Sequence, residues 1–450
     1  MDIKGKKISI IGAVRSGIAA AKLAKKMGAV PFVSDFSPAE KMTAAKNKLD
    51  AENISCEFGR HSEKVFECDL IVTSPGVPSD SDILKSAKKK NIRIISELEF
   101  ACRFCKGKIV AITGTNGKTT TTMLCSHLLN RGGLKAYTAG NIGLAFSEIA
   151  LDVNENEYVS LETSSFQLDF IEEFKPDYGI LLNITPDHLD RYDNVFKNYI
   201  DSKMNLIANQ NEFDFFIYNS DDENIPRVIG NKSVNVYSFS VNQKIKKGTY
   251  ISEGKIFFAD KEDEEIVCGT DALILKGEHN LSNALSVVTV AKIIGIPNAV
   301  IKDALASFPG VEHRLEFVRN YKGVDFINDS KATNVDSVWY ALRSFNKPIF
   351  LILGGKDKGN DYTRIEALVK KNVKKIYAIG ASADKVFNFF KNDTDVEKVN
   401  TLEEAVLKGS IDAVENEIVL LSPACASFDM FENYEHRGRV FKEAVNNLPL

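Results

Sequence analysis

The sequence predicts an α/β fold of three domains, each built around a mostly parallel β-sheet. Three observations support this prediction. Short apolar, β-prone runs alternate with helical patterns along the chain, as expected when helices connect parallel strands. Many of these runs end at Gly, Ser or Asp, which are typical of the polar turns at the carboxyl ends of such strands. The chain has 450 residues, which corresponds to about three domains of ordinary size.

The first stretch, residues 1–96, predicts a Rossmann-like domain. Its predicted strands are 7–11, 30–34 and 70–73, and an Ala/Leu/Lys helix ending near Met27 follows the first of them. The second strand ends at Asp35 and the third at Ser74-Pro75-Gly76. Loops at these strand ends are where such domains bind nucleotides. Gly12 to Gly17 has the outer glycines of a dinucleotide fingerprint, but Val14 replaces the middle one, which disfavours a nicotinamide cofactor.

The second stretch, residues 97–310, contains a candidate phosphate-binding loop. An apolar run at 108–112 predicts a strand, and Leu124, Leu128 and Leu129 predict a helix over 121–130. Between them lies TGTNGKTT, a glycine-rich loop in the context that phosphate binding requires. The usual pattern has its first glycine five residues before the Gly-Lys pair, where this chain has Ile112; Gly114 takes that role two positions later, so the loop is a variant. The alternative is a plain glycine turn before a Thr-capped helix. The candidate ATP-binding residues here are Gly114, Thr115, Asn116, Gly117, Lys118, Thr119 and Thr120.

Two further strands of this stretch end in polar residues. The run 158–161 leads to Glu162, where a carboxylate ligand of Mg²⁺ would lie, although a helix-capping acid is the alternative. The run 178–182 leads to Asn183 and then to His188, which is either functional or an ordinary structural histidine. Lys203 lies on a predicted helix and, from its pattern alone, is an ordinary surface lysine. A polar, β-prone stretch over 213–275 predicts hairpins on the same domain.

The third stretch, residues 311–450, predicts a second Rossmann-like domain with strands at 324–327, 349–353, 375–379 and 417–421. Three of these are followed by polar runs: NDSKATN at 328–334, GGKDKG at 354–359 and SPACASFD at 422–429. If the strands share one sheet edge, these runs together favour a small polar or anionic ligand. The alternative is three unrelated turns. Upstream, His279, Asn280 and Asn283 begin an amphipathic helix, where they either contact a base or cap and pack.

Composition narrows the class of protein. Hydrophobic residues make up 44% and charged residues 26%, which indicates a globular protein. The net charge of −4 argues against a non-specific nucleic-acid interaction. No apolar run is long enough to cross a bilayer and the N-terminus lacks a signal-peptide cleavage site. Seven scattered cysteines are typical of a reducing compartment, so we expect a cytoplasmic protein. Cys102 and Cys105 match C-x-x-C without a second pair, so an ordinary structural role is favoured over metal or redox chemistry.

Together these pieces resemble the Mur ligases, the ATP-dependent amide-bond-forming enzymes of peptidoglycan precursor synthesis. The motifs match in order over nearly the whole chain: TGTNGKTT, LETSSFQLD, NITPDHLDRY, GEHNLSNALS, HRLE, NDSKATN and SPACASFDMF. Within the family, Gly140-Asn141-Ile142-Gly143 and the stretch from Ser422 are similar to the members that add D-glutamate. The Asp-Asn-Pro-Arg signature of the members that add diaminopimelate or lysine is absent.

The resemblance implies a monomer that binds UDP-N-acetylmuramoyl-L-alanine through its first domain, ATP and two Mg²⁺ through its second and D-glutamate through its third. It implies substrate contacts by Asp35, Ser37, Gly76, Asn141, Lys331, Thr333, Lys358, Ser427 and Phe428. It implies that Asn280, Arg314 and Asp329 complete the ATP site. The implied catalytic residues are Lys118, Glu162, His188 and Lys203, and the implied metal ligands are Thr119, Glu162, His188 and a carbamylated Lys203.

Two alternative functions remain compatible with the sequence. A folylpolyglutamate synthase or another Mur ligase is the nearest rival, and amino-acid dependence of phosphate release separates them. A nucleotide-gated binding module with ATPase activity is a rival of a different class, favoured by ATP turnover without any amino acid.

Overall fold

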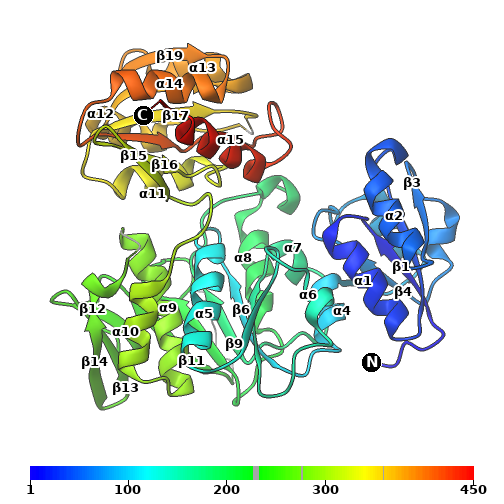
Figure 1. Ribbon diagram of the computed structural model, residues 1–450. Helices are drawn as coiled ribbons and strands as arrows, with labels where there is room; N and C mark the ends of the chain where they lie inside the picture. The colour runs from blue at the N-terminus through cyan, green and yellow to red at the C-terminus, as the bar shows by residue number, and fades with distance from the viewer. Residues whose placement is uncertain (227–232, 275–276, 358, 450) are drawn as a thin grey trace. The chain divides into compact units, whose positions relative to one another are not determined.

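The computed structural model describes residues 1–226, 233–274, 277–357 and 359–449 (Figure 1). The chain falls into two compact units, Met1–Ile274 with Leu281–Phe308, and Leu275–Asn280 with Pro309–Leu450. The first unit contains two sheets and the second contains one. Most strand pairs in the three sheets are parallel, and the pairs β12–β13, β13–β14 and β15–β16 are antiparallel, so the prediction of an α/β fold with mostly parallel sheets is confirmed.

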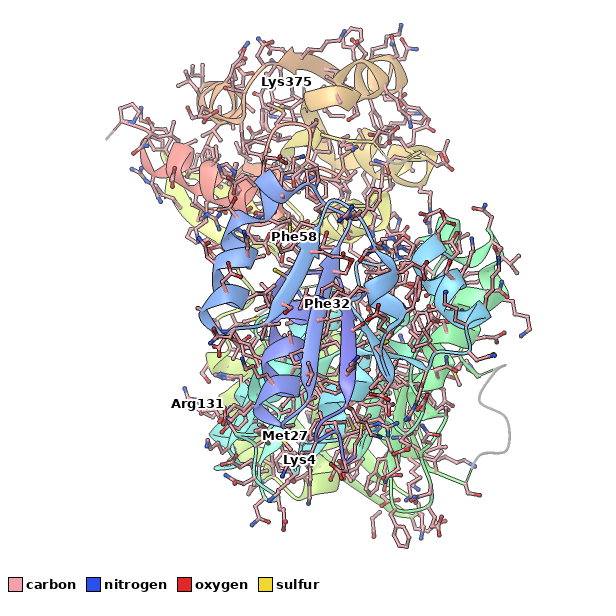
Figure 2. The ribbon with its side chains drawn as sticks, turned by 90° about the vertical axis from the view of Figure 1, so that its right-hand side faces the viewer. Lys4, Met27, Phe32, Phe58, Arg131 and Lys375 are labelled. Atoms are coloured by element: carbon pink, nitrogen blue, oxygen red, sulfur yellow. The ribbon has the colours of Figure 1, made fainter. Side chains whose placement is uncertain are left out.

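The first sheet has five parallel strands in the order β3-β2-β1-β4-β5. Predicted strands at 7–11, 30–34 and 70–73 are confirmed as β1, β2 and β4. Phe32 and Phe58 lie on the neighbouring strands β2 and β3 (Figure 2). The strands are β1 (Lys7–Ile11), β2 (Val30–Asp35), β3 (Ser55–Phe58), β4 (Leu70–Thr73) and β5 (Ile94–Ser96); the helices are α1 (Arg15–Lys26), α2 (Thr43–Ala51), α3 (Asp82–Lys89) and α4 (Glu97–Cys102).

Helix α1 shows how the sequence directs this part of the fold. Gly12 has a φ of +95°, which favours glycine, and it turns the chain from β1 into the helix. The helix then buries a stripe of alanines, including Ala20, Ala21 and Ala24, that allows close packing on the sheet. Because β2 and β4 pair parallel to β1, their carboxyl ends lie beside this turn, at one edge of the sheet.

The second sheet has the order β14-β13-β12-β11-β10-β9-β6-β8-β7. Its strands are β6 (Lys108–Thr113), β7 (Ala136–Gly140), β8 (Tyr158–Glu162), β9 (Tyr178–Leu181), β10 (Phe215–Asn219), β11 (Asn235–Ser240), β12 (Lys247–Ser252), β13 (Lys255–Asp260) and β14 (Asp263–Gly269). Its helices are α5 (Lys118–Arg131), α6 (Phe146–Ile149), α7 (Ser165–Leu168), α8 (Phe196–Met204), α9 (Glu278–Ile294) and α10 (Asn298–Ser307).

The expectation of hairpins over 213–275 is wrong for the first part of that stretch. Strands β10 and β11 join the sheet parallel to β9, and β12 pairs parallel to β11. The chain between β10 and β11, residues 220–234, is long enough for the crossover that parallel pairing requires. Only β12, β13 and β14 form antiparallel hairpins, as expected.

The third sheet has the order β15-β16-β20-β17-β18-β19, and only β15 pairs antiparallel. Leu351 and Leu353 pack on the side of α11–α13, whereas Phe350 and Ile352 pack on the side of α14 and α15. Burial on both faces explains the continuous apolar runs. The strands are β15 (Glu316–Tyr321), β16 (Val324–Asn328), β17 (Ile349–Gly354), β18 (Val373–Ile379), β19 (Asp395–Val399) and β20 (Ile418–Leu421); the helices are α11 (Val335–Arg343), α12 (Thr363–Asn372), α13 (Ala383–Phe390), α14 (Leu402–Asp412) and α15 (Tyr434–Asn446).

Candidate active site

The glycine-rich loop joins β6 to α5, so the predicted strand–loop–helix is confirmed. Gly114 and Gly117 have φ values of +153° and +86°, which glycine tolerates and other residues rarely adopt. A Cβ on Gly117 would also lie 2.4 Å from Oδ1 of Asn283. The helix begins at Lys118, so the N–H groups of its first turn and its partial positive charge lie at the loop, as anion binding requires.

Asn183, at the end of β9, holds the main chain of this loop. Its side-chain Oδ1 accepts a hydrogen bond from the Asn116 N–H at 2.8 Å, and its Nδ2 donates to the Asn116 carbonyl at 3.0 Å. Its main-chain carbonyl accepts from the Thr115 N–H at 2.9 Å. From the sequence, Asn183 is recognisable only as a residue at a strand end, and this role was not predicted. The available signal was its position just after β9 (Tyr178–Leu181), the strand that pairs with β6.

Two lysines converge on the loop. Nζ of Lys118 donates to the carbonyls of Gly114 and Thr115 at 2.8 and 2.7 Å, and Nζ of Lys203 donates to the Gly114 carbonyl at 2.9 Å. Lys203 is only 1% exposed, so its interpretation as an ordinary surface lysine is wrong. Helix α8 places Lys203 one turn after Tyr199, whose ring centre lies 4.5 Å from Nζ. Burial, and next the charge of Lys118, lower the pKa of Lys203 well below its ordinary value, although Asp187 and Asp169 oppose the shift.

Thr119 and Glu162 bring two hard oxygen atoms together. The Thr119 hydroxyl donates to Oε2 of Glu162 at 2.8 Å, and Nδ2 of Asn141 donates to Oε1 at 3.2 Å. Parallel pairing of β6 with β8 sets Glu162 opposite Ile112, just before the loop. Hydroxyl and carboxylate oxygens are ligands that Mg²⁺ prefers, so this pair fits a magnesium ion. The alternative of Glu162 as a helix cap is wrong, because Ser164 and Gln167 form the capping box of α7.

His188 lies in the loop after β9 and its side chain is exposed. Its φ is +51°, its Nε2 lies 3.7 Å from Oδ2 of Asp187, and its ring packs edge-on against Phe166 with centres 5.3 Å apart. Asp187 also acts electrostatically on Lys203. This loop therefore presents an imidazole and a carboxylate on the side of the site that contains Lys203.

A cavity of about 840 Å³ opens at the carboxyl ends of the first sheet. It is lined by all four residues that the sequence associated with the first substrate: Asp35, Ser37, Gly76 and Asn141. The Asp35 carboxylate is fixed by the N–H groups of Ala13 and Ser37, at 2.7 and 2.8 Å. Asn141 lines the cavity and also donates to Glu162, so it joins the cavity to the oxygen pair beside the phosphate loop.

In the second unit, the three polar runs follow β16, β20 and β17, which are neighbours in the sheet. The prediction that they share one edge is confirmed, and the alternative of unrelated turns is wrong. Asp329 is buried there, where Oδ2 accepts from the Ser422 hydroxyl at 2.8 Å and Oδ1 from the Leu315 N–H at 3.2 Å. Burial raises the pKa of Asp329 to about 6, against the lowering effects of Arg314 and Ser422.

Arg437, which was not predicted as a site residue, holds these runs in place. Its guanidinium donates to the carbonyls of Cys425 and Ser330, at 3.1 and 2.7 Å, and to the Ser330 hydroxyl at 3.0 Å. Burial lowers its pKa to about 10, which leaves it charged at neutral pH. One buried cation thus ties the run after β16 to the run after β20.

The other candidate residues of the second unit vary in exposure. Nζ of Lys331 lies 5.4 Å from the centre of the Tyr434 ring. Asn280 and Ser427 are buried, Thr333 is half-buried and Phe428 is exposed. Lys358 lies outside the described residues.

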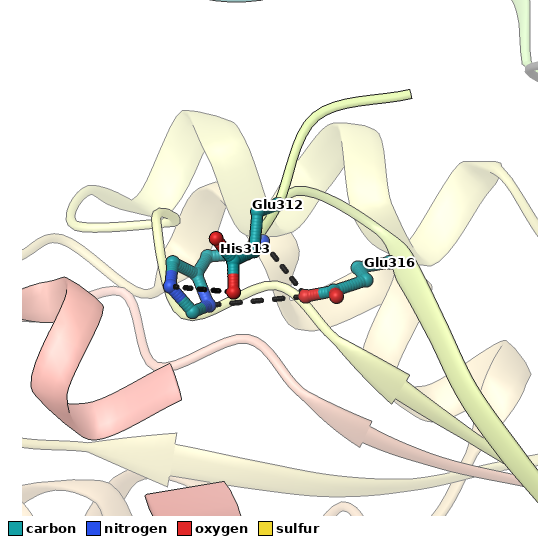
Figure 3. Close-up of side chains that lie close together, drawn as sticks. All are labelled: Glu312, His313 and Glu316. Carbon is teal, nitrogen blue, oxygen red and sulfur yellow. Dashed lines mark hydrogen bonds and ion pairs between the residues drawn. The ribbon is translucent and has the colours of Figure 1, made fainter. Parts of the chain in front are cut away.

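A cluster of Glu312, His313 and Glu316 in the second unit has metal-ligand composition (Figure 3). The structure favours an ion-pair cluster instead. Nζ of Lys442 bonds to both carboxylates, at 3.0 and 2.6 Å, and Nδ2 of Asn328 donates to Nδ1 of His313 at 2.9 Å. These partners use the atoms that a metal would need.

The C-x-x-C pair shows no sign of an activated thiolate. Cys102 and Cys105 are free thiols. Burial raises the pKa of Cys102 to about 12 and raises that of Cys105 as well. Reactive and metal-binding cysteines need the opposite shift, so the structural role that the sequence favoured is supported.

Comparison with known proteins places this site in a family. Residues 6–96 match the Mur ligase MurD-like N-terminal domain, residues 112–291 the Mur ligase middle domain and residues 313–425 the Mur ligase glutamate ligase domain. The chain is 43% identical to a UDP-N-acetylmuramoylalanine–D-glutamate ligase of Chloroherpeton thalassium, over 99% of both chains. It is 44% identical to the enzyme of that name from Koribacter versatilis, over 100% of this chain and 99% of the relative.

Solved structures agree on the fold. UDP-N-acetylmuramate-alanine ligase MurC from Thermotoga maritima is 20% identical with a TM-score of 0.62, over 98% of this chain and 99% of that one. MurF from Acinetobacter baumannii is 16% identical with the same TM-score, over 97% and 93%. Among the residues that the structure describes, no helix combines the length and apolar character needed to cross a membrane.

Proposed function

This chain belongs to the Mur ligase family, and on that premise we propose that it joins D-glutamate to UDP-N-acetylmuramoyl-L-alanine, with conversion of ATP to ADP and phosphate. The observation that carries the proposal is the similarity over the whole chain to relatives named for this reaction. The geometry that supports it is one continuous set of polar groups, from the cavity through Asn141 and Glu162 to Thr119 in the phosphate loop.

In this proposal, each of the three stretches of the chain binds a different ligand. Residues 1–96 bind the UDP-linked acceptor, residues 97–310 bind ATP and residues 311–450 bind D-glutamate. The three matched family domains and the three sheets support this division. We further propose a cytoplasmic monomer that binds no nucleic acid and does not insert into membranes.

The carboxylate of the L-alanyl group is a poor electrophile, so it must first be given a leaving group. A carboxylate oxygen of the L-alanyl group attacks the γ-phosphorus of ATP, the bond to ADP breaks, and an acyl phosphate forms. The amine of D-glutamate, after losing a proton, then attacks the acyl carbon, and the carbon–oxygen bond breaks to release phosphate. Mg²⁺ supplies charge neutralisation for the phosphoryl oxygens when bound.

The residues of the first unit have defined tasks in this scheme. Lys118 exchanges its bonds to the loop carbonyls for charged phosphate oxygens, which are stronger acceptors. Thr119 and Glu162 hold one magnesium ion, and His188 holds a second. Asn141 orients Glu162 and contacts the acceptor where the cavity meets the loop.

Lys203 acts as a carbamate in this proposal. A carbamate forms from CO₂ and a neutral amine, and burial beside Lys118 favours the neutral amine. The modified side chain then offers anionic oxygens to magnesium, which a buried ammonium would repel.

The remaining candidate residues bind the ligands. In the second unit, Asn280, Arg314 and Asp329 contact ATP, and Lys331, Thr333, Lys358, Ser427 and Phe428 contact D-glutamate or the ligated product. In the first unit, Asp35, Ser37 and Gly76 contact the uridine diphosphate.

The experiment that tests the proposal is a panel of acceptors and amino acids. Phosphate release is expected only with UDP-N-acetylmuramoyl-L-alanine, D-glutamate and Mg²⁺ together. Equal release with L-glutamate, or with no amino acid, contradicts it and favours the ATPase module. Release with another amino acid or with a folate acceptor favours another member of the wider ligase group.

A further inference from the structure

A row of three hydrogen-bonded side chains, Glu57, Ser34 and His61, ends with His61 at the wall of the 840 Å³ cavity. The Ser34 hydroxyl lies 2.8 Å from Oε1 of Glu57 and 2.7 Å from Nδ1 of His61. Ser34 is fully buried at the end of β2, and His61 is half-buried and lines the cavity. None of the roles proposed above uses this row.

The row fixes which nitrogen of His61 bears the proton. Burial alone would raise the pKa of Glu57, but hydrogen bonds from Ser62 and Ser34 outweigh it and lower the pKa, so Glu57 is an anion. The single Ser34 proton must lie toward that carboxylate, because two oxygen atoms 2.8 Å apart without a proton between them would repel each other. The Ser34 oxygen is then the acceptor, so Nδ1 of His61 is the donor.

The other ring nitrogen is consequently a lone-pair acceptor. Burial lowers the pKa of His61, against the charges of Glu57 and Asp35, so the ring is neutral at neutral pH and Nε2 bears no proton. Nε2 forms no hydrogen bond with the described part of the chain. Beside it stands Phe36, which is 72% exposed and whose ring centre lies 6.0 Å from that of His61. This wall of the cavity therefore combines an aromatic surface with one hydrogen-bond acceptor.

Such a wall suits a flat heterocycle that presents an N–H group. Uracil has a proton on N3, whereas cytosine has a lone pair at the same position. We propose that Nε2 of His61 accepts a hydrogen bond from N3–H of the uracil ring, and that Glu57 and Ser34 set the specificity by holding His61 in this tautomer. The inference rests on the proposed function, which places a UDP-linked substrate in this cavity.

The test compares binding of UDP and CDP to the full chain by calorimetry at neutral pH. Loss of one hydrogen bond and the facing of two lone pairs predict that UDP binds about tenfold more tightly than CDP. His61→Phe retains an aromatic ring and removes the acceptor, so UDP binding weakens, CDP binding stays, and the ratio falls to about threefold or less. His127→Phe is the matched control, because His127 is half-buried but lies on α5 with Ser307 as its partner; its ratio is expected to match that of the wild type.

A second variant and a spectroscopic measurement complete the test. Ser34→Ala removes the acceptor for Nδ1–H, so both tautomers become populated and the ratio falls part of the way. In the unaltered protein, ¹⁵N NMR of the histidine rings should show a His61 Nε2 without a proton. A protonated Nε2 in the wild type overturns the inference, even if His61→Phe fails to fold. So does a tenfold preference that survives in His61→Phe.

The experiments distinguish failure of the His61 assignment from failure of the proposed function. If the protein ligates D-glutamate to the UDP-linked acceptor but His61→Phe keeps its preference, only the specificity assignment is wrong. If the wild type neither binds UDP nor uses the acceptor, the proposed function itself is wrong.

Discussion

Replacing Asn183 with alanine removes the side chain that holds the phosphate loop. Two hydrogen bonds disappear, from the Asn116 N–H to Oδ1 and from Nδ2 to the Asn116 carbonyl. The bond from Thr115 N–H to the Asn183 carbonyl remains, because it uses the main chain. The loop thus loses its side-chain support without any change to its own sequence.

The magnitude follows from these two bonds. Each contributes about 0.5–1.5 kcal/mol, so the loss is about 2 kcal/mol, equivalent to roughly 30-fold in an equilibrium constant. We expect the loss to appear mainly as disorder of the loop, which ATP must reorder on binding. The KM for ATP should then rise by about 10- to 30-fold, with a smaller fall in kcat, and the urea-unfolding free energy should drop by at most about 2 kcal/mol.

Asn209→Ala is the matched control. Asn209 is also half-buried, and its Nδ2 donates to two main-chain carbonyls, those of Glu172 and Phe174, both at 3.0 Å. This variant should lose similar stability and leave the KM for ATP unchanged. If both variants lose stability and neither changes the KM for ATP, Asn183 does not hold a loop that binds ATP.

Three further outcomes are expected. Lys118→Ala should fold normally by circular dichroism and lose at least about hundredfold in phosphate release, because a charged transition-state contact is gone; near-normal turnover would remove this loop from the mechanism. Lys203→Ala should lose most activity, formate or acetate should restore part of it, and ¹³CO₂ should label the wild type; normal activity in the variant would exclude the carbamate. The pKa of Asp329 is raised in the folded state to about 6, so its contribution to stability is complete below about pH 3.8 and is lost as the pH rises through about 6, a change of about 3 kcal/mol. Urea unfolding across that range should show this loss in the wild type and not in Asp329→Asn, and parallel pH profiles would contradict it.

The strands that the sequence predicted best are those covered on both faces. The run at 349–353 is continuous and apolar because helices pack on each side of β17, and residues 109–113 of β6 are likewise all buried. Strands β15 and β19 were missed because they are edge strands with polar, alternating side chains such as those of EFVRNY. Edge strands expose one side to water, so their sequences differ little from those of loops.

Some residues of the candidate site were also predictable from the sequence and others were not. Glycines, Lys118 and Thr119 were predictable because a phosphate loop is a local structure, and its spacing carries the chemistry. The burial of Lys203 was not, since it depends on how α8 packs against a loop 89 residues earlier in the chain. Asn183 and Arg437 were missed for the same reason, because their partners lie on other elements.

The transfer of oxygen from the acceptor to phosphate tests the central claim most directly. UDP-N-acetylmuramoyl-L-alanine labelled with ¹⁸O in both carboxylate oxygens is incubated with ATP, D-glutamate, Mg²⁺ and the protein, and the released phosphate is analysed by mass spectrometry. An acyl-phosphate ligase leaves one labelled oxygen in each phosphate, because the carboxylate oxygen that attacked the γ-phosphorus departs with it. Phosphate that contains no ¹⁸O would show that water cleaved ATP and would contradict the proposed ligation.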